Sequence, residues 1–365
     1  MKTKRHSQHG RFGRSAFHLL IGTTAIALCG YAYGASTSES QTLARPQTVQ
    51  LTAAAQRRAY SYGWPVKPFD RQHPVRGNFG DPRTIFAGPP TRRGLFTSGG
   101  AFSFHQGIDI CAPDGTPVYP VRSGVVRIVT ADWVEVDSGG GAAFQYWHIH
   151  PQVAPGQQVT ERESVLGPIL EHSEHVHLTQ LQDGRAVNPL SPGNIGPYTD
   201  TTLPRVNGFD FRAGESGPEL LPEYLHGRVE IAVDASDTQP MRVPGLWHGL
   251  PVSPAKLSYR IESLPRHRLI RSGTSMDVTH GLPATTNMWS TYARGSRMNA
   301  AQMGQHRYWF QPGVYLFKLT PAPLDTHTLP DGAYALKVTA CDTAGNHSSR
   351  TQVFSVHNRA TWLNG

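Results

Sequence analysis

Short segments in which apolar and polar residues alternate recur along this chain. Alternation with a period of two is typical of a β-strand that buries one face, and turns rich in Gly, Pro, Ser and Asp separate the segments. In the first half the alternating segments are residues 116–119, 124–130, 133–137, 142–150, 158–160, 165–170 and 174–180. Their spacing predicts a compact antiparallel β-sheet or barrel.

The same alternation returns after a stretch rich in Pro and Gly at residues 189–202. The later segments are residues 227–233, 256–262, 313–319, 332–340 and 351–356. They predict a two-sheet sandwich, and the closing hairpin over residues 331–346 resembles that of immunoglobulin-like modules. Residues 265–312 have no clear period, so we expect an irregular insertion there. The expected fold class is mainly β.

The beginning of the chain differs from the rest. A basic stretch is followed by an apolar run at residues 16–34, which is typical of a secretory signal peptide and also compatible with an N-terminal membrane anchor. The predicted organisation is a leader at 1–34, a flexible spacer at 35–63, a compact antiparallel β domain at 64–192, a linker at 193–204 and a β-sandwich domain at 205–358. We therefore expect an exported protein that is extracellular or associated with the cell envelope.

Composition and charge narrow the class of protein. With 37 Gly, 29 Pro and only 16% charged residues, the chain favours strands and turns over long helices. The formal net charge is +8, but the leader holds five Lys or Arg and no acidic residue, which leaves +3 for the remainder. This small excess does not indicate nucleic-acid binding, and we expect no nucleic-acid partner.

Histidines carry the candidate chemistry. Residues two or four apart on a strand point to the same face, so His105 and Asp109 can supply two metal ligands, and His177 a third from a neighbouring strand. Zinc in hydrolases usually has three nitrogen or oxygen ligands and one water. The pattern predicts a zinc site of His105, Asp109 and His177, with His148 and His175 beside the metal, where imidazoles can transfer protons.

Several motifs in one order resemble a known family, the lysostaphin-type (LytM-like) zinc metalloendopeptidases. The resemblance covers about residues 65–192 and rests on RGNFGDPR at 76–83, FHQGIDI at 104–110, APDGTPVY at 112–119, Gly124-Val-Val, Tyr146-x-His148, PGQQV at 155–159 and His175-Val-His177. Members fold as compact antiparallel β domains and cut amide bonds in peptidoglycan peptides.

The resemblance implies roles for individual residues. His105, Asp109 and His177 take the places of the zinc ligands, and His148 and His175 those of the catalytic histidines, as base toward the attacking water or as stabilisers of the oxyanion. Which histidine performs which step stays open at this point. The expected function is an exported zinc endopeptidase that acts as a monomer on peptidoglycan peptides.

Two other functions fit part of the pattern. One is a catalytically silent LytM-like module that binds the cell wall or regulates another wall hydrolase. Silent members usually lose zinc ligands, whereas all five places are filled here. The other is a structural or adhesion protein in which the sandwich is the working part and a zinc ion only stabilises the fold.

Overall fold

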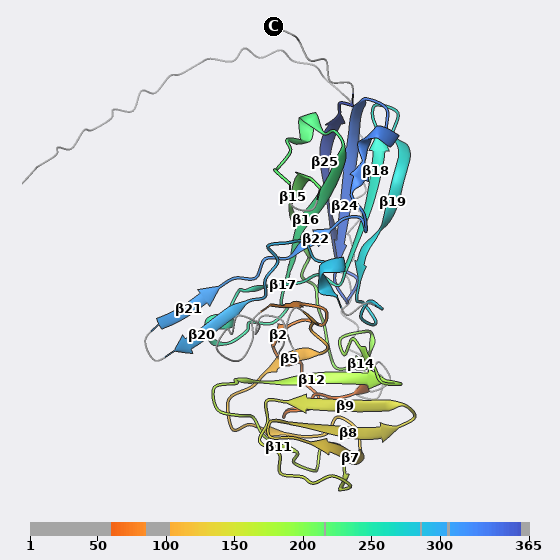
Figure 1. Cartoon of the computed structure of the whole chain (residues 1–365). Helices are drawn as coiled ribbons and strands as arrows, with labels where there is room; N and C mark the ends of the chain where they lie inside the picture. Colours follow the sequence, from red (N-terminus) through yellow and green to blue (C-terminus); the bar gives the residue numbers. More distant parts are fainter. Residues whose placement is uncertain (1–59, 85–102, 215–216, 285–286, 305–306, 359–365) are drawn as a thin grey trace, which may run out of the picture. The chain divides into compact units, whose positions relative to one another are not determined.

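The computed structural model describes residues 60–84, 103–214, 217–284, 287–304 and 307–358, and these residues belong to one compact unit (Figure 1). Their regular secondary structure is almost entirely β-strand, with only four short 3-10 helices, which confirms the predicted mainly β class. The leader at 1–34 and most of the spacer at 35–63 lie outside the described residues. Within the described part, no helix is long and apolar enough to cross a membrane.

Fourteen short strands lie between residues 60 and 195 of the described chain. They are β1 (Tyr60–Tyr62), β2 (Val75–Gly77), β3 (Pro82–Arg83), β4 (Ser103–Phe104), β5 (Ile108–Cys111), β6 (Pro117–Val118), β7 (Gly124–Val129), β8 (Trp133–Gly139), β9 (Ala142–Trp147), β10 (Gln158–Val159), β11 (Gly167–Pro168), β12 (His175–Gln182), β13 (Arg185–Val187) and β14 (Gly193–Ile195).

Eight of these strands form one antiparallel sheet in the order β10-β7-β8-β9-β12-β5-β2, with β13 paired to β12. Figure 1 shows β7, β8, β9 and β12 side by side. The predicted alternation has its physical basis here, since every second residue of β9, including Phe144 and Tyr146, is buried. The other face of the sheet is therefore left for polar side chains.

Strand β1 differs from the sequence expectation. Tyr60–Tyr62 pairs in parallel with Gly193–Ile195, although the first segment was expected in the spacer and the second in the linker. Tyr62 is buried and packs edge-on against Phe144, with ring centroids 5.1 Å apart. Ordered structure thus begins before Trp64, because Tyr62 closes the end of the core.

The second half adds eleven strands and four short 3-10 helices among the described residues. They are β15 (Arg205–Ala213), η1 (Pro222–Tyr224), β16 (Arg228–Thr238), η2 (Gly245–Trp247), β17 (Pro251–Val252), β18 (Lys256–Ser263), β19 (Arg268–Asp277), η3 (Met288–Ser290), β20 (Ala300–Gly304), β21 (Arg307–Gln311), β22 (Leu316–Lys318), β23 (Leu324–Asp325), η4 (Thr326–Thr328), β24 (Gly332–Cys341) and β25 (His347–Val356).

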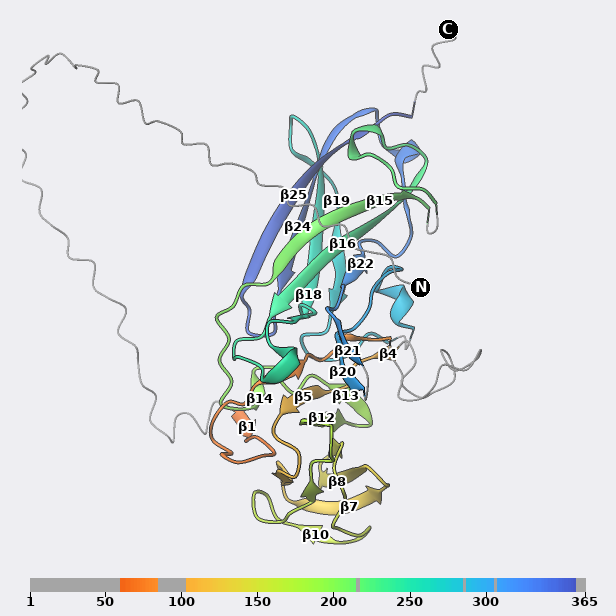
Figure 2. The same cartoon turned by 90° about the vertical axis from the view of Figure 1, so that its left-hand side faces the viewer.

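Two antiparallel sheets organise this half. One has the order β15-β16-β17, with β22 and β23 also paired to β16, and the other has the order β19-β18-β24-β25 (Figure 2). Phe211 of β15 packs against Phe354 of β25, with ring centroids 6.1 Å apart. The two sheets thus share a core, while the immunoglobulin-like topology stays a prediction.

The expected irregular insertion at residues 265–312 contains regular structure instead. Strand β19 pairs with β18 through eight residue pairs, and β20 and β21 form a hairpin of their own. Of the ten β19 residues only Met276 is buried, because the strand lies at the edge of its sheet. An edge strand with little burial lacks the apolar alternation that marks a strand in sequence.

The second half contacts the segment that precedes the histidine motifs. The Tyr292 hydroxyl donates to the Gly80 carbonyl at 2.8 Å, and the Ser253 amide donates to the Asp81 carboxylate at 2.9 Å. Tyr292, Ser253 and Asp81 are all buried. Buried hydrogen bonds are costly to break, so these contacts tie the loop around Gly80 to the second half.

Three carboxylates meet where residues 198–202 approach the second half. Oxygen atoms of Asp200, Asp237 and Asp342 lie within 4.8 Å of one another. Burial, reinforced by the charges of Asp200 and Asp342, raises the pKa of Asp237 to about 8. The folded protein therefore holds a proton on Asp237 at a pH where the unfolded chain has released it.

This raised pKa predicts that the contribution of Asp237 to stability falls as pH rises. Between about pH 4 and pH 8 the folded state binds more protons at Asp237 than the unfolded state does, so the contribution of Asp237 to the free energy of unfolding decreases as pH rises. Asp237→Asn should flatten this dependence and raise Tm at pH 8 by a few degrees, at about 1–2 °C for each 1 kcal/mol in a chain of this size. Thermal unfolding from pH 5 to pH 8 measures it, with the exposed Asp70→Asn as control. Because buried histidines with lowered pKa values change the wild-type Tm in the opposite direction below about pH 6.5, the readout is the difference in Tm between Asp237→Asn and the wild type. A difference that does not grow between pH 5 and pH 8 would contradict the expectation.

Candidate metal centre

The centre of the site is a pair of cross-strand neighbours. Asp109 of β5 lies directly opposite His177 of β12, and on the other side of β12 His177 faces Trp147 of β9. His175 is two residues before His177 and therefore on the same face. The buried Val176 and Leu178 point to the opposite face, into the core.

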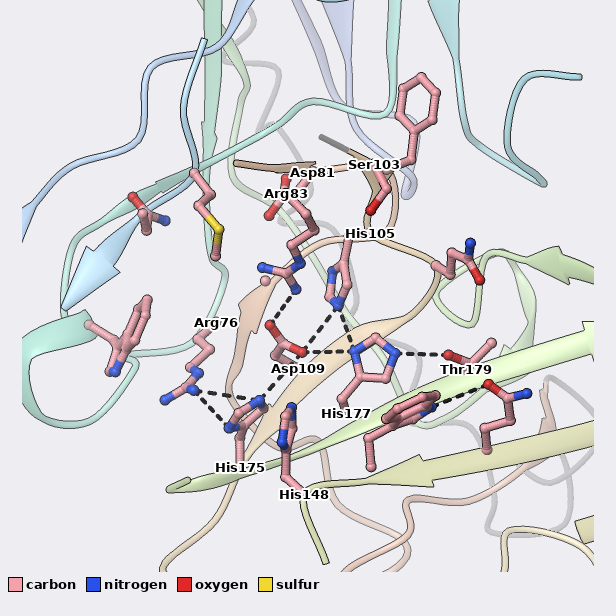
Figure 3. Close-up of a pocket in the computed structure, with 18 residues that line it drawn as sticks. Arg76, Asp81, Arg83, Ser103, His105, Asp109, His148, His175, His177 and Thr179 are labelled. Carbon is pink, nitrogen blue, oxygen red and sulfur yellow. Dashed lines mark hydrogen bonds and ion pairs between the residues drawn. The ribbon is translucent and has the colours of Figure 1, made fainter. Parts of the chain in front are cut away.

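His105 reaches the same place from the end of β4. Its amide donates to the Asp81 carbonyl and its carbonyl accepts from the Gly80 amide, both at 2.8 Å. Its Nδ1 lies 2.8 Å from the Asn78 carbonyl, which holds the proton on that nitrogen. The lone pair of Nε2 is thereby directed at His177 (Figure 3).

Three ligand-type atoms converge. Nε2 of His105 lies 2.7 Å from Nδ1 of His177, and Oδ1 of Asp109 lies 3.1 Å from the first nitrogen and 3.0 Å from the second. The three side chains are the ones that the sequence predicted as zinc ligands. Of the two carboxylate or imidazole clusters in the described residues, this alone contains imidazoles.

Neighbouring polar groups fix the orientation of these side chains. Arg83 forms an ion pair with Oδ2 of Asp109 at 2.7 Å, which leaves Oδ1 turned toward the imidazoles. Nε2 of His177 lies 2.8 Å from the Thr179 hydroxyl, so Nδ1 is the ring nitrogen that faces the cluster. Partners of this kind set the ring orientation and tautomer of metal-binding histidines.

Burial controls the protonation of the cluster. Desolvation lowers the pKa of His105 to about 3, and the Arg83 charge acts in the same direction. Desolvation alone would raise the pKa of Asp109, but Arg83 and the nearby imidazoles hold it well below its ordinary value. The result is a neutral imidazole beside an ionised carboxylate, the forms in which these side chains bind metal ions.

The two predicted catalytic histidines lie beside this cluster. The His148 and His175 rings are 4.5 Å apart, and Nε2 of His175 is 3.6 Å from Oδ1 of Asp109. Burial lowers the pKa of His148 to about 4. His148 directly follows β9 and has a φ of 66°, a conformation that residues other than Gly rarely adopt and that occurs often at functional sites.

One nitrogen of His175 has two competing neighbours. Its Nδ1 lies 2.5 Å from the Ser173 carbonyl and 2.7 Å from Nη2 of Arg76. A carbonyl accepts a hydrogen from Nδ1, whereas a guanidinium only donates, so the two contacts favour opposite tautomers of the ring.

Two glycines allow the strands to come this close. A Cβ on Gly107 would overlap the Leu178 carbonyl and lie 2.8 Å from Nε2 of His177. A Cβ on Gly77 would lie 2.5 Å from Oδ2 of Asp109. Any larger side chain at either position would displace a member of the cluster.

The cluster lies in a groove of about 700 Å³. Its walls come from both halves of the chain, since Trp147 and Gln145 of β9 line it together with Trp247, Met298 and Asn299. The sequence alone predicts no metal-binding or catalytic role for Arg76, Arg83, Thr179 or Trp247. Their sequence context carries no metal-binding or catalytic spacing, and only the folded chain places them beside the histidines.

Fold and site together define a class: a mainly β protein with a buried His/Asp cluster open to a groove. Residues 103–189 match the sequence profile of peptidase family M23. This part of the chain is therefore a domain of peptidase family M23, a family of metallopeptidases, which confirms the predicted family.

Solved structures with similarity to the chain cover only part of it. A zinc containing peptidase from Vibrio cholerae is 20% identical over 36% of this chain and 39% of its own, with a TM-score of 0.27. The catalytic domain of the prophage-encoded M23 protein EnpA from Enterococcus faecalis is 21% identical over 36% of this chain and 95% of its own (TM-score 0.25). Lysostaphin is 16% identical over 47% and 89% (TM-score 0.24). A search of curated proteins found no match.

The close approach at Gly107 gives a direct test of the site's packing. Gly107→Ala should lower the free energy of unfolding by about 1–3 kcal/mol, the usual cost of overpacking, because Leu178 and His177 must move. Denaturant unfolding measures the change. Gly208→Ala is the matched control, since a Cβ there meets no atom within 4 Å. Equal stability of the two variants would show that β5 and β12 are less closely packed than described.

Proposed function

We propose that this protein is a zinc-dependent endopeptidase that hydrolyses amide bonds in peptidoglycan peptides. The M23 domain supports a peptidase, and one observation carries the proposal further: two imidazole nitrogens and a carboxylate oxygen converge, within 3.1 Å of one another, in an open groove. Three such ligands with an accessible fourth side are the arrangement of catalytic rather than structural zinc sites.

The donor set fits zinc in chemistry and spacing. The second nitrogen of His105 and of His177 is already engaged, by the Asn78 carbonyl and the Thr179 hydroxyl, so each ring presents one nitrogen to an ion. Ligands of tetrahedral zinc lie about 3.3 Å apart, close to the 2.7–3.1 Å between these atoms. When bound, zinc supplies a Lewis acid for the scissile carbonyl and a water of lowered pKa.

The chain's own residues would then handle substrate and protons. The groove holds the peptide with its amide near His148 and His175. Each neutral imidazole can accept a proton at one ring nitrogen and donate one from the other. One of the pair serves as base toward water, and one protonates the departing amine or stabilises the oxyanion. Arg83 keeps the Asp109 carboxylate ionised and oriented throughout.

The proposal extends to where the protein acts. The basic and apolar pattern at residues 1–34 favours export, and peptidoglycan lies outside the cytoplasmic membrane. We propose that the protein works there as a monomer. N-terminal sequencing of the secreted form and its mass in solution test both points.

The ligand assignment predicts loss of metal in a single variant. His177→Ala should reduce zinc from one equivalent to a small fraction, because it removes the central donor of the cluster. Zinc content of the purified protein, measured by elemental analysis, gives the result. The exposed His150 is the matched position, and His150→Ala should keep its zinc. Full zinc occupancy in His177→Ala would exclude the proposed ligand set.

The catalytic assignment predicts the opposite combination. His148→Ala and His175→Ala should retain zinc and Tm within a few degrees and lose about 10²–10⁴ in kcat, the range for removal of a general acid or base. Mass spectrometry of digested peptidoglycan reports the cleaved bond, with His150→Ala again as control. A zinc-loaded wild-type protein that releases no fragment would favour the silent wall-binding module. If the wild type hydrolyses no peptidoglycan and removal of zinc lowers its Tm, a structural zinc would be favoured.

A further inference from the structure

Arg76 is a cation placed in the wall of the groove next to a proposed catalytic histidine. It is the middle residue of β2, and because Val75 and Gly77 on either side are buried, its side chain extends into the groove. Its Nη2 lies 2.7 Å from Nδ1 of His175 (Figure 3). The second half of the chain supplies its other neighbour, since the guanidinium carbon lies 4.2 Å from the centre of the Trp247 ring.

The groove leaves this charge without a carboxylate. The other arginine of the lining, Arg83, is paired with Asp109 at 2.7 Å. The other lining acid, Asp81, accepts backbone amides from Asn78 and Ser253, each at 2.9 Å. For Arg76 no ion pair within 4.0 Å is found among the described residues, and Asp109 and Glu174 act on it only through longer-range attraction.

The hydrogen-bonding capacity of Arg76 is also largely unused. A guanidinium carries five N–H donors, and only Nη2 has a protein partner among the described residues. That partner is a poor one, because the Ser173 carbonyl competes for the same nitrogen of His175. A half-buried guanidinium with an aromatic ring against one face and free donors on its edge is preorganised for a planar anion.

We propose that Arg76, supported by Trp247, binds a free carboxylate of the substrate peptide next to the scissile amide. The inference deepens the proposed peptidase function and rests on it. The planar fork of a guanidinium matches the two oxygens of a carboxylate in a bidentate pair. Because His175 is in contact with Arg76, a carboxylate bound there lies beside the reacting group. The enzyme should therefore select peptides that are anionic at this position over peptides in which the same carboxyl is amidated.

Two synthetic stem peptides test whether the enzyme selects the anionic form. They differ only in the carboxyl next to the scissile amide, which is free in one and amidated in the other. The wild type should cleave the free acid with a kcat/KM about 10- to 100-fold higher, the range for one charge-assisted hydrogen-bonded pair. In Arg76→Gln the ratio should fall to about 1, and Arg76→Lys should keep part of it because the charge remains. Trp247→Ala should lower the ratio mainly through a higher KM for the free acid.

The ratio separates substrate binding from a structural effect. If Arg76 only positioned His175, Arg76→Gln would slow both peptides equally and leave the ratio unchanged, which would overturn the proposal. Arg127→Gln is the control, because Arg127 is an exposed arginine paired with Asp137 outside the groove and should leave the ratio intact. Thermal unfolding of each variant shows that the fold is retained.

A binding measurement keeps this inference distinct from the peptidase proposal. Calorimetry of the zinc-loaded protein with N-methylated, uncleavable versions of the two peptides should show tighter binding of the free acid by wild type and no preference in Arg76→Gln. If the wild type shows this binding preference but cleaves neither of the normal peptides, the carboxylate subsite is retained and the peptidase function is rejected. Equal binding of the two analogues by the wild type, or binding of neither, would reject the subsite.

Discussion

The register of β5 against β12 is the constraint on which the site depends. It places Asp109 opposite His177 and His175 opposite Cys111. A slip of one residue would turn both histidines into the core and bring Val176 and Leu178 to the groove. Because those two side chains are fully buried, such a slip would expose apolar surface, and the hydrophobic pattern of β12 therefore positions the polar cluster.

The cluster itself is costly to the fold. His105 is 2% exposed and Asp109 6%, and buried polar groups destabilise a protein unless each finds a partner. Each of the three side chains has a partner. The His105 ring is bonded to the Asn78 carbonyl, the Asp109 carboxylate to Arg83, and the His177 ring to the Thr179 hydroxyl. What these partners leave unsatisfied is the inner face, where two nitrogen lone pairs and an oxygen meet. A cation at that place would neutralise the repulsion among them, which is why the cluster suits a metal better than a structural role in the apo protein.

The sequence predicted those parts of the fold and of the site that depend on local residue patterns. Alternation along a strand explains why Asp109, His175 and His177 share a face, as the sequence predicted. The alternation does not place His105 and His148, which lie just after β4 and β9 rather than within a strand, and their roles followed only from the family motifs. The class of fold followed from the same alternation. The roles of Arg76, Arg83 and Trp247 in the groove could not be predicted, since each reaches it through contacts with residues distant in sequence. Strand β19 was not predicted for a related reason. It is an exposed edge strand that forms by pairing with β18, and its own sequence has no apolar period.

The second half of the chain takes part in building the site. Tyr292 bonds the Gly80 carbonyl and Ser253 bonds the Asp81 carboxylate, while the backbones of Gly80 and Asp81 bond both sides of His105. A continuous path of hydrogen bonds therefore connects the second half to a proposed ligand. The segment 103–189 that matches the family profile contains neither this loop nor the Arg76 and Arg83 side chains. That segment supplies the donors, but the geometry that directs His105 and Asp109 to one point depends on residues outside it, namely residues 76–83 and the sheets of the second half.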